Sequence, residues 1–430
     1  MMKRILAVFA VVMLVMAAGC GKPKDTGAIR VMHWGDLIEM DNNKKIIADI
    51  KKKTGIDVVQ SRATANNYIE KVLTEAAAGM APDVMFVEAG NFKAFAEKGL
   101  LVDLTELMKN DNDKDFNIKD YYPEIVDRFT IDGKIYVIPR DIAPICVIYY
   151  NKKLFDEAGV PYPKDDWTWD EFLKTAQKLT KRDASGRMEQ FGFLDEWTIW
   201  DAWVYSNGGS IVDDVKKPTK CVLDSKEAIE GVRFRADLSG KYGVAPSPSL
   251  IATTSMGIQG TASVFMSGKA AMFYTGYWKA GYFRPITKFE WDIVMFPKSP
   301  KGIRKYPSGG SGYAITSQCK DKKKAWEVVK RFAGEQGQRF LSSQGGLQPA
   351  IMKLANSEQF LDDQPPKNKK IMLTAVKDIV FSPLTSDWEM MNTRYIAPQM
   401  DDIWNGKRDA AEVMKSITRE INRDFFTKKK

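Results

Sequence analysis

The side chains that carry most enzyme chemistry are scarce in this sequence. Histidine occurs once in 430 residues, as His33. A Ser–His–Asp triad could therefore form only through that residue, and a two-histidine zinc site cannot form. The four cysteines are Cys20, Cys146, Cys221 and Cys319, and no Cys-x-x-Cys pair occurs among them. This spacing excludes zinc-ribbon and thioredoxin motifs, and we expect no bound metal and no cofactor.

The sequence also lacks the motifs of nucleotide-binding proteins. The segment 263–270 resembles a phosphate-binding loop only loosely, because Ser263 stands where the first glycine is needed and Ala270 stands where Ser or Thr would ligate magnesium. The glycine cluster at 309–312 lacks the Gly-x-Gly-x-x-Gly spacing, and no Gly-x-Ser-x-Gly elbow occurs. His33 falls within an expected strand, so we interpret it as a structural residue.

The N-terminus predicts export. Lys3 and Arg4 precede 14 uncharged, mostly apolar residues, a length that suits a secretory signal but is too short to span a bilayer. Small residues then run directly into Cys20, a pattern that resembles a bacterial lipobox. We therefore expect a lipoprotein signal peptide at 1–19, lipidation of Cys20 and a tether at 20–27. The alternative is an ordinary signal peptide followed by an incidental cysteine.

The distribution of charge along the chain argues against a nucleic-acid partner. The net charge is +9, and removal of the leader lowers it to +7. Basic runs at 51–53, 320–324 and 428–430 fall at helix ends, loops or the terminus, with acidic residues interspersed elsewhere. Export and this dispersion argue against nucleic acid, although attraction to an anionic envelope surface remains.

The elements expected to position any site alternate along the chain. Residues 28–34, 56–60 and 84–87 read as strands, and 42–53, 68–78 and 91–98 read as amphipathic helices that stop at glycines. This order predicts a parallel sheet with right-handed crossovers. The region 160–300 is rich in tryptophan, and helices are expected again at 323–334, 336–343, 357–361 and 409–423. At this length we expect two or three globular units.

Four segments occur in a distinctive order. They are Pro82–Val84; Tyr149–Phe155 with 158–161 and 167–172; Gly268–Met272 with 276–278; and Gly309–Ile315 with 345–349. In this order and spacing, behind the lipobox, they resemble the extracellular solute-binding proteins of carbohydrate-uptake ABC transporters, the group that includes maltose-binding protein. The resemblance covers nearly all of 28–430.

The resemblance implies an α/β fold of two lobes, the type II periplasmic-binding-protein fold, with a ligand cleft between lobes joined by crossing hinge segments. It places 28–143 plus 312–346 in an N-terminal lobe and 144–311 plus 347–430 in a C-terminal lobe, with crossings near 141–146, 307–312 and 345–350. The implied function is that of a lipid-anchored extracytoplasmic receptor, periplasmic or cell-surface according to the host envelope. It would close on a sugar or oligosaccharide and deliver it to the transmembrane subunits of an ABC permease. We expect a monomer without enzymatic activity.

Sugars present apolar C–H faces and a rim of hydroxyls, so aromatic planes and charged or amide groups together recognise them. Strand-end positions and the resemblance together supply the candidate ligand-binding residues, which are Trp34, Asp36, Glu88, Arg140, Asp141, Trp200, Trp203, Tyr274, Gly276, Trp278, Gly309, Gly310, Trp388 and Arg394. We expect one of Trp200 and Trp203, three residues apart, to face the core.

Two alternatives remain open. The same fold could bind another solute, such as a polyol phosphate, a peptide or a metal chelate, and Arg140 and Arg394 would suit an anion. A secreted glycoside hydrolase would need two carboxylates at a fixed separation, and the sequence does not show whether Glu88, Asp141 or Asp195 could form such a pair.

Overall fold

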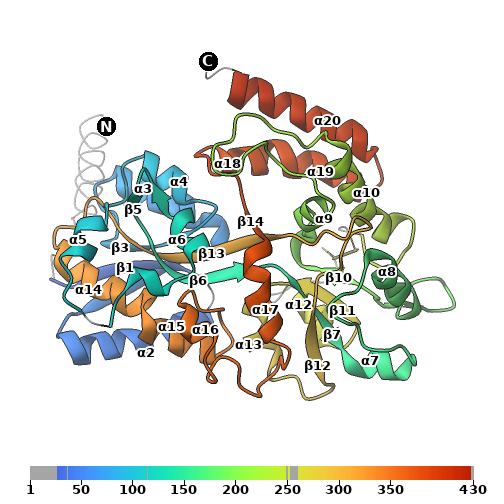
Figure 1. Ribbon diagram of the computed structural model, residues 1–430, viewed down its shortest axis with the longest axis horizontal. Coiled ribbons are helices and arrows are strands. Elements are labelled where there is room, and N and C mark those ends of the chain that lie inside the picture. Colours follow the sequence, from blue (N-terminus) through green and yellow to red (C-terminus); the bar gives the residue numbers. More distant parts are fainter. Residues whose placement is uncertain (1–26, 36, 114, 248–249, 252–259, 428–430) are drawn as a thin grey trace, which may run out of the picture.

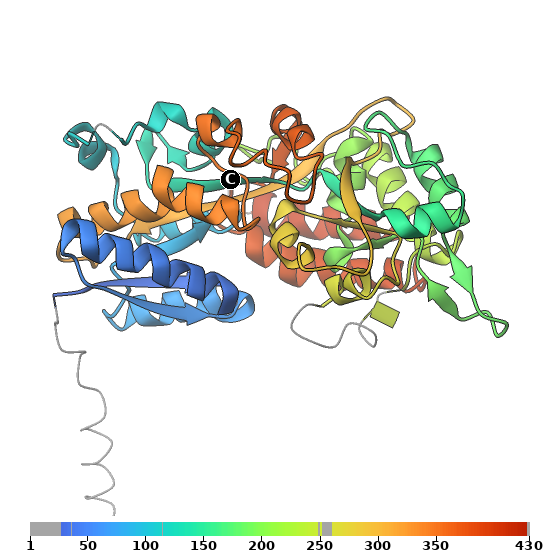
Figure 2. The same ribbon diagram turned by 90° about the horizontal axis from the view of Figure 1, so that it is seen from below.

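The computed structural model describes residues 27–35, 37–113, 115–247, 250–251 and 260–427. These residues form two lobes that lie side by side, with strands β6 and β13 running between them (Figure 1, Figure 2). Each lobe has its own sheet and its own hydrophobic core. The predicted leader, the lipidation site Cys20 and the candidate Asp36 fall outside the described residues.

The first lobe is built on a six-stranded sheet. Its order is β14-β13-β3-β1-β2, with β6 paired to β13. The strands are β1 (Ile29–Trp34), β2 (Val58–Ala63), β3 (Val84–Glu88), β6 (Ile138–Pro144), β13 (Tyr306–Ile315) and β14 (Ile379–Phe381). The pairs β1–β2 and β1–β3 are parallel, as the strand–helix alternation of 28–99 predicts.

Helices cover this sheet because each presents an apolar face to it. They are α2 (Leu37–Thr54), α3 (Ala65–Ala77), α4 (Phe92–Glu97), α5 (Thr105–Lys109), α6 (Pro123–Arg128), α14 (Lys322–Ala333), α15 (Glu335–Ser343) and α16 (Met352–Ala355). The first of them ends where Gly55 adopts a φ of 72° and donates its amide to the Lys51 carbonyl, a closure that glycine makes without steric cost.

The second lobe is built on a four-stranded sheet of order β10-β11-β7-β12. Its strands are β10 (Leu194–Asp195), β11 (Met272–Thr275), β7 (Val147–Asn151) and β12 (Trp291–Met295). Helices α7 (Lys152–Glu157), α8 (Trp169–Lys178), α9 (Asp201–Ser206), α10 (Lys226–Gly240), α12 (Ala262–Met266), α13 (Ala280–Phe283) and α17 (Lys370–Ala375) surround it. Two helices of this lobe begin at side-chain caps: the Asn151 side chain caps α7, and Thr168 with Glu171 forms a capping box on α8.

The C-terminal helices belong to the second lobe. They are α18 (Trp388–Met390), the π-helical η5 (Met391–Ile396), α19 (Ala397–Trp404), α20 (Ala410–Ile421) and the π-helical η6 (Asn422–Thr427). Val413, Ile417 and Ile421 of α20 are buried in one cluster with Val204 and Val232. The amphipathic pattern of the last helix is therefore core packing.

Three connections join the lobes. β6 ends at Pro144 in the first sheet, and β7 begins at Val147 in the second. β13 starts at Tyr306, which packs in the second core, and reaches Tyr313, which packs in the first. The third connection follows α16 and includes β14, which pairs with the start of β13.

The expected boundary at 347 differs from the structure, and residues 379–381, expected in the second lobe, form β14 of the first sheet. The residues that follow position 347 do not enter the second lobe, because their apolar side chains pack in the first core; these are Leu347, Ala350, Ile351 and Leu354. Phe360 and Met372 then pack in the second core. The lobe assignment of 347–354 was wrong because it depends on packing partners far away in the sequence.

The three described cysteines, Cys146, Cys221 and Cys319, are free and buried. Within the described ranges, no helix combines the length and apolar character needed to cross a bilayer. The same ranges contain no cluster of three or more His, Cys, Asp or Glu residues that could hold a metal ion.

Candidate functional site

In each lobe, one strand ends beside a segment that crosses between the lobes. In the second lobe Val147, which directly follows the crossing from β6, pairs with Thr275 at the end of β11. In the first lobe Glu88 ends β3 and pairs with Ser311 of β13, the strand that arrives from the second lobe. Ligands of open α/β sheets bind beyond such carboxyl ends. We call the region between these two strand edges the inter-lobe face.

Two tryptophans form an aromatic platform on the second-lobe side. The Trp197 side chain follows β10, is 62% exposed and stacks on Trp278 with ring centroids 6.0 Å apart and ring planes 9° apart. Trp197 and Thr198 have φ angles of 38° and 52°. Bulky residues reach this left-handed region only at a cost of roughly 1–3 kcal/mol each, and such strain concentrates at functional sites. Trp278 was a predicted ligand residue, whereas Trp197 was missed.

An ion pair ties the two halves of the platform together. Glu196 precedes Trp197 and accepts a hydrogen bond from the Thr275 hydroxyl. Lys279 follows Trp278, and its ammonium lies 2.8 Å from the Glu196 carboxylate. Both charged side chains are largely buried. The contact therefore holds the segment after β10 against the segment after β11, which fixes the two indoles relative to each other.

Gly276 makes room for one of these indoles. A Cβ at position 276 would lie 1.9 Å from Cζ3 of Trp278. The ring folds back over the glycine, so the missing side chain accommodates Trp278. Gly276 was a candidate ligand-binding residue, and the structure shows that it makes space for the ring of Trp278.

The first-lobe side carries a compact charged cluster. The Arg140 guanidinium contacts Glu39 (Nη1–Oε1, 2.6 Å) and Asp141 (Nε–Oδ2, 3.0 Å), and it lies over the Phe86 ring. Asp141 also accepts hydrogen bonds from the amide and hydroxyl of Ser311. Two carboxylates therefore neutralise Arg140, and Asp141 binds the crossing strand β13.

Glu88 is the poorly compensated acid of this cluster. The pKa of Glu88 is raised to about 7, first by burial and then by the neighbouring carboxylates of Asp141, Glu39 and Glu389, while Arg140 opposes them. Glu389 belongs to α18 of the second lobe, so acids from both lobes influence this carboxyl. A group with such a pKa can donate or accept a hydrogen bond near neutral pH.

Two more candidate tryptophans border this region. Trp34 ends β1, and its indole N–H is buried without a hydrogen-bond partner in the described structure. Trp388 begins α18, and a Cβ at Gly90, just beyond β3, would lie 3.9 Å from its Cδ1. Both side chains are partly buried. Trp388 therefore brings a second-lobe aromatic group to the edge of the first lobe.

Two candidates belong to the hydrophobic core instead. Trp203 is fully buried and packs against Trp169, Phe234 and Phe296. Tyr274 is also fully buried, and its hydroxyl donates to the Ile145 carbonyl at 2.6 Å. Neither side chain can reach a ligand, and these two predictions are corrected for that reason.

The structure separates Trp200 from Trp203, as their spacing predicts. Trp200 directly precedes α9 and packs, half-buried, against the cluster that contains the C-terminal helices. Sequence could not show which of the two faces the core, because the enclosing rings come from α8, α10 and the segment after β12.

Gly309, Gly310 and Arg394 occupy other settings. Gly309 and Gly310 pair with Ala143 and Ile142 of β6, so they lie within the crossing ladder. Gly310 has a φ of 141°, and a Cβ there would lie 2.6 Å from Cδ1 of Ile125. Their backbone roles suit a hinge strand. Arg394 is exposed on η5 and forms no ion pair with any residue that the structure describes.

The comparisons with known proteins agree with this architecture. Residues 35–339 match the model of the bacterial extracellular solute-binding protein family, and the chain belongs to that family. The members of this family are extracellular solute-binding proteins, and solved structures of such proteins share the fold of this chain.

Individual relatives have names that refer to sugars. The chain is 24% identical to the maltodextrin-binding protein MdxE of Bacillus subtilis over 82% of this chain and 78% of that protein. It is 23% identical to the galactooligosaccharide-binding protein of the same organism over 92% of this chain and 88% of that protein.

Solved structures show the same two-lobed fold. The substrate-binding protein Lmo0181 of Listeria monocytogenes, in complex with cycloalternan, superimposes with a TM-score of 0.82 at 25% identity and covers 92% of this chain and 98% of its own. Maltose-bound MalE3 of T. maritima superimposes with a TM-score of 0.78 at 20% identity over 92% and 99%.

Proposed function

We propose that this chain is the lipid-anchored receptor of an ABC importer that binds a sugar or oligosaccharide at the inter-lobe face and closes around it. The closed form then presents both lobes to the transmembrane subunits of a permease. Binding favours closure because the ligand contacts both lobes only in that arrangement.

The observation that carries this proposal is the platform of Trp197 and Trp278. An exposed indole held in a strained backbone, parallel to a second indole, offers the flat apolar surface that covers a pyranose face. On the first-lobe side, the Glu88 carboxyl and the indole N–H of Trp34, which has no hydrogen-bond partner among the described residues, can satisfy the hydroxyl rim.

The relatives' printed ligands support the same class. They are maltodextrin, galactooligosaccharide and cycloalternan, all built from sugar units.

The other solutes weighed from the sequence have less support at this face. A phosphate or another anion needs an available cation, but Arg140 is already neutralised by Glu39 and Asp141. The acidic groups Glu88 and Glu389 would also repel an anion.

A thermal-shift screen of the chain from Lys22 onward tests the ligand class. Native-state binding stabilises by RT ln(1 + [L]/Kd), about 2.7 kcal/mol at a hundredfold excess over Kd. We expect a saccharide to raise the Tm by several degrees and Trp197→Ala to reduce that shift. Tyr162→Ala is the matched control, since Tyr162 is also an exposed aromatic residue of the second lobe but lies beside α7. Absence of any response to saccharides at millimolar concentration would refute the assignment.

Fractionation tests the anchor. We expect the full chain to be recovered with membranes, and Cys20→Ala to shift it to the soluble extracytoplasmic fraction or to leave an uncleaved leader. Equal membrane recovery of a processed Cys20→Ala chain would contradict lipidation at this residue.

A further inference from the structure

A hollow in the second lobe lies away from the aromatic platform. It has a volume of about 420 Å³ and is lined by the end of β12, the loop 298–305, the start of β13 and the short helix η4 (Val376–Asp378) with the adjacent turn of α17. β12 and β10 are opposite edges of the second sheet, so the hollow lies across that sheet from Trp197. It also adjoins the point where β13 and β14 pair and leave for the first lobe.

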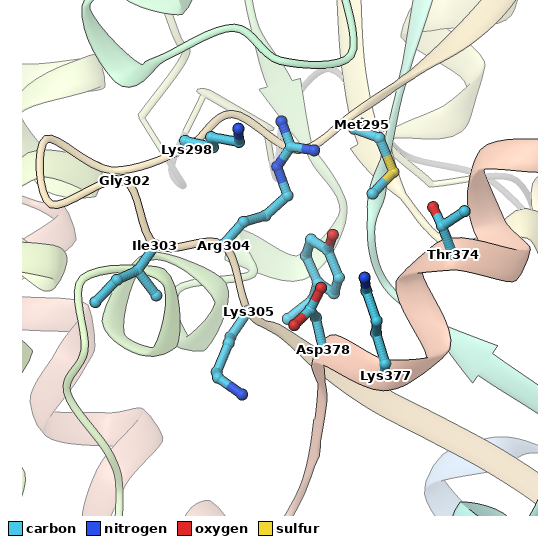
Figure 3. A pocket seen from close by; sticks show the side chains of 10 residues that line it. Met295, Lys298, Gly302, Ile303, Arg304, Lys305, Thr374, Lys377 and Asp378 are labelled. Carbon is cyan, nitrogen blue, oxygen red and sulfur yellow. The ribbon is translucent and has the colours of Figure 1, made fainter.

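The hollow carries an excess of positive charge. Lys298, Arg304 and Lys377 line it, and Figure 3 shows Lys305 extending away from these three. None of the three cations forms an ion pair with a described residue; Lys298 and Arg304 are partly buried, and Lys377 is exposed. Asp378 is the acid that lines the hollow. Three cations near one acid repel one another, and a bound anion would reduce this repulsion.

Two buried polar atoms at the hollow also lack partners. Tyr306 is fully buried, and its hydroxyl makes no hydrogen bond of normal geometry, although the Arg304 guanidinium lies nearby. Nε of Arg304 is buried without an acceptor, while its Nη2 donates to the Asp165 carbonyl. A buried donor without an acceptor destabilises the folded state. An acceptor bound in the hollow would lie next to this pair of residues.

We propose that this hollow binds a phosphate monoester, with the phosphate held by Arg304, Lys298 and Lys377. A dianion matches several converging cations better than a carboxylate does, and its oxygens accept from guanidinium, ammonium and hydroxyl donors together. One water occupies about 30 Å³ in the liquid, so a hollow of about 420 Å³ has more room than a phosphate group needs. The remaining space, next to the Thr374 hydroxyl, suits a small polyol attached to the phosphate.

Bound phosphate would bridge two segments. Lys298 and Arg304 lie on the loop before β13, and Lys377 lies on η4 before β14. Both segments lead directly into strands that join the lobes. The ligand therefore stabilises the second-lobe end of these strands, and this effect does not depend on what binds at the inter-lobe face.

Titration calorimetry and thermal shift at low ionic strength test the proposal on the chain from Lys22 onward, which contains every described residue. The probes are inorganic phosphate and glycerol 3-phosphate, with glycerol as the neutral comparison. We expect saturable binding of both anions, tighter for glycerol 3-phosphate, and none of glycerol. We expect Lys298→Gln/Lys377→Gln to weaken binding at least tenfold, and Tyr306→Phe to weaken it severalfold.

Lys301→Gln is the matched control, because Lys301 lies on the same loop but pairs with Glu227 and does not line the hollow. It should bind phosphate as the wild type does. The double variant should keep its Tm without ligand, since it loses like-charge repulsion, and should keep any saccharide response. Failure of both anions to bind at millimolar concentration, or equal binding by the double variant, would overturn the site while leaving the sugar proposal unaffected.

Discussion

The ring of Trp278 lies over the α-carbon of Gly276 so closely that any side chain at 276 would displace it; a Cβ there would be 1.9 Å from Cζ3. The platform that carries the functional proposal therefore depends on the absence of a side chain. This dependence gives a test that leaves both indoles in the sequence.

We predict that Gly276→Ala weakens saccharide binding by about 2- to 13-fold, the equivalent of an aromatic contact worth roughly 0.5–1.5 kcal/mol. In a Trp278→Ala background the same alanine should have little further effect, because the ring that it displaces is gone. Calorimetric Kd values for the four proteins of this cycle provide the measurement. Additive losses would show that Gly276 contacts the ligand directly.

We predict that Asp195→Ala lowers the free energy of unfolding by about 3–5 kcal/mol, because it leaves Arg235 buried without its partner. The guanidinium and carboxylate form two contacts of 2.6 Å, and both side chains are at most 2% exposed. Adding Arg235→Met should recover much of this loss. Urea unfolding measures it, with Lys174→Ala as the control at an exposed pair worth about 0–1 kcal/mol. A loss no larger than that of the control would contradict the prediction.

We predict that Glu88→Gln raises the Tm of the ligand-free protein more at pH 8 than at pH 5. The native pKa of Glu88 is about 7 against an ordinary value of 4.5, because burial and neighbouring acids disfavour its charge. Its contribution to stability is therefore complete below pH 4.5 and is lost as the pH rises through 7. The variant cannot ionise and escapes this loss. Thermal melts across this range measure the difference, which must grow with pH for the prediction to stand.

We predict that the contribution of His33 to stability changes with pH in the opposite direction to that of Glu88. Burial, with Arg140 nearby, lowers the pKa of His33 to about 3 from 6.5, so the native state holds it neutral. Its contribution to stability is present above pH 6.5 and is lost as the pH falls towards 3, by up to about 1.4 kcal/mol per pH unit. His33→Asn should lose less stability than the wild type between pH 6.5 and 4 in urea titrations. Parallel curves for the two proteins would show that His33 does not titrate this way.

Local features of the chain were predictable because their causes are local. The parallel sheet of the first lobe follows from alternating strands and helices within 28–99. The cap at Asn151 and the capping box of Thr168 and Glu171 involve residues three apart, so their spacing alone predicts them. The interpretation of His33 as structural is likewise confirmed, since it is fully buried beside Tyr313.

The site was only partly predictable because it depends on distant pairings. Trp197 gains its role from a backbone conformation and from Trp278, 81 residues along the chain. Trp203 and Tyr274 have residue types that suit sugar binding, but the core encloses both. Aromatic residue type indicates what a side chain can bind, whereas burial decides whether it can reach a ligand.

By itself, the sequence determined the class of this protein, because its four ordered segments resemble those of solute-binding proteins and its alternating strands and helices predict a parallel α/β sheet. Only the tertiary structure decided which aromatics form a surface, which lobe holds 347–354 and where unpaired cations gather. Periodicity and capping act over a few residues and can be read along the chain. Burial, stacking and charge compensation arise between segments that the fold brings together, and the sequence alone does not fix those partners.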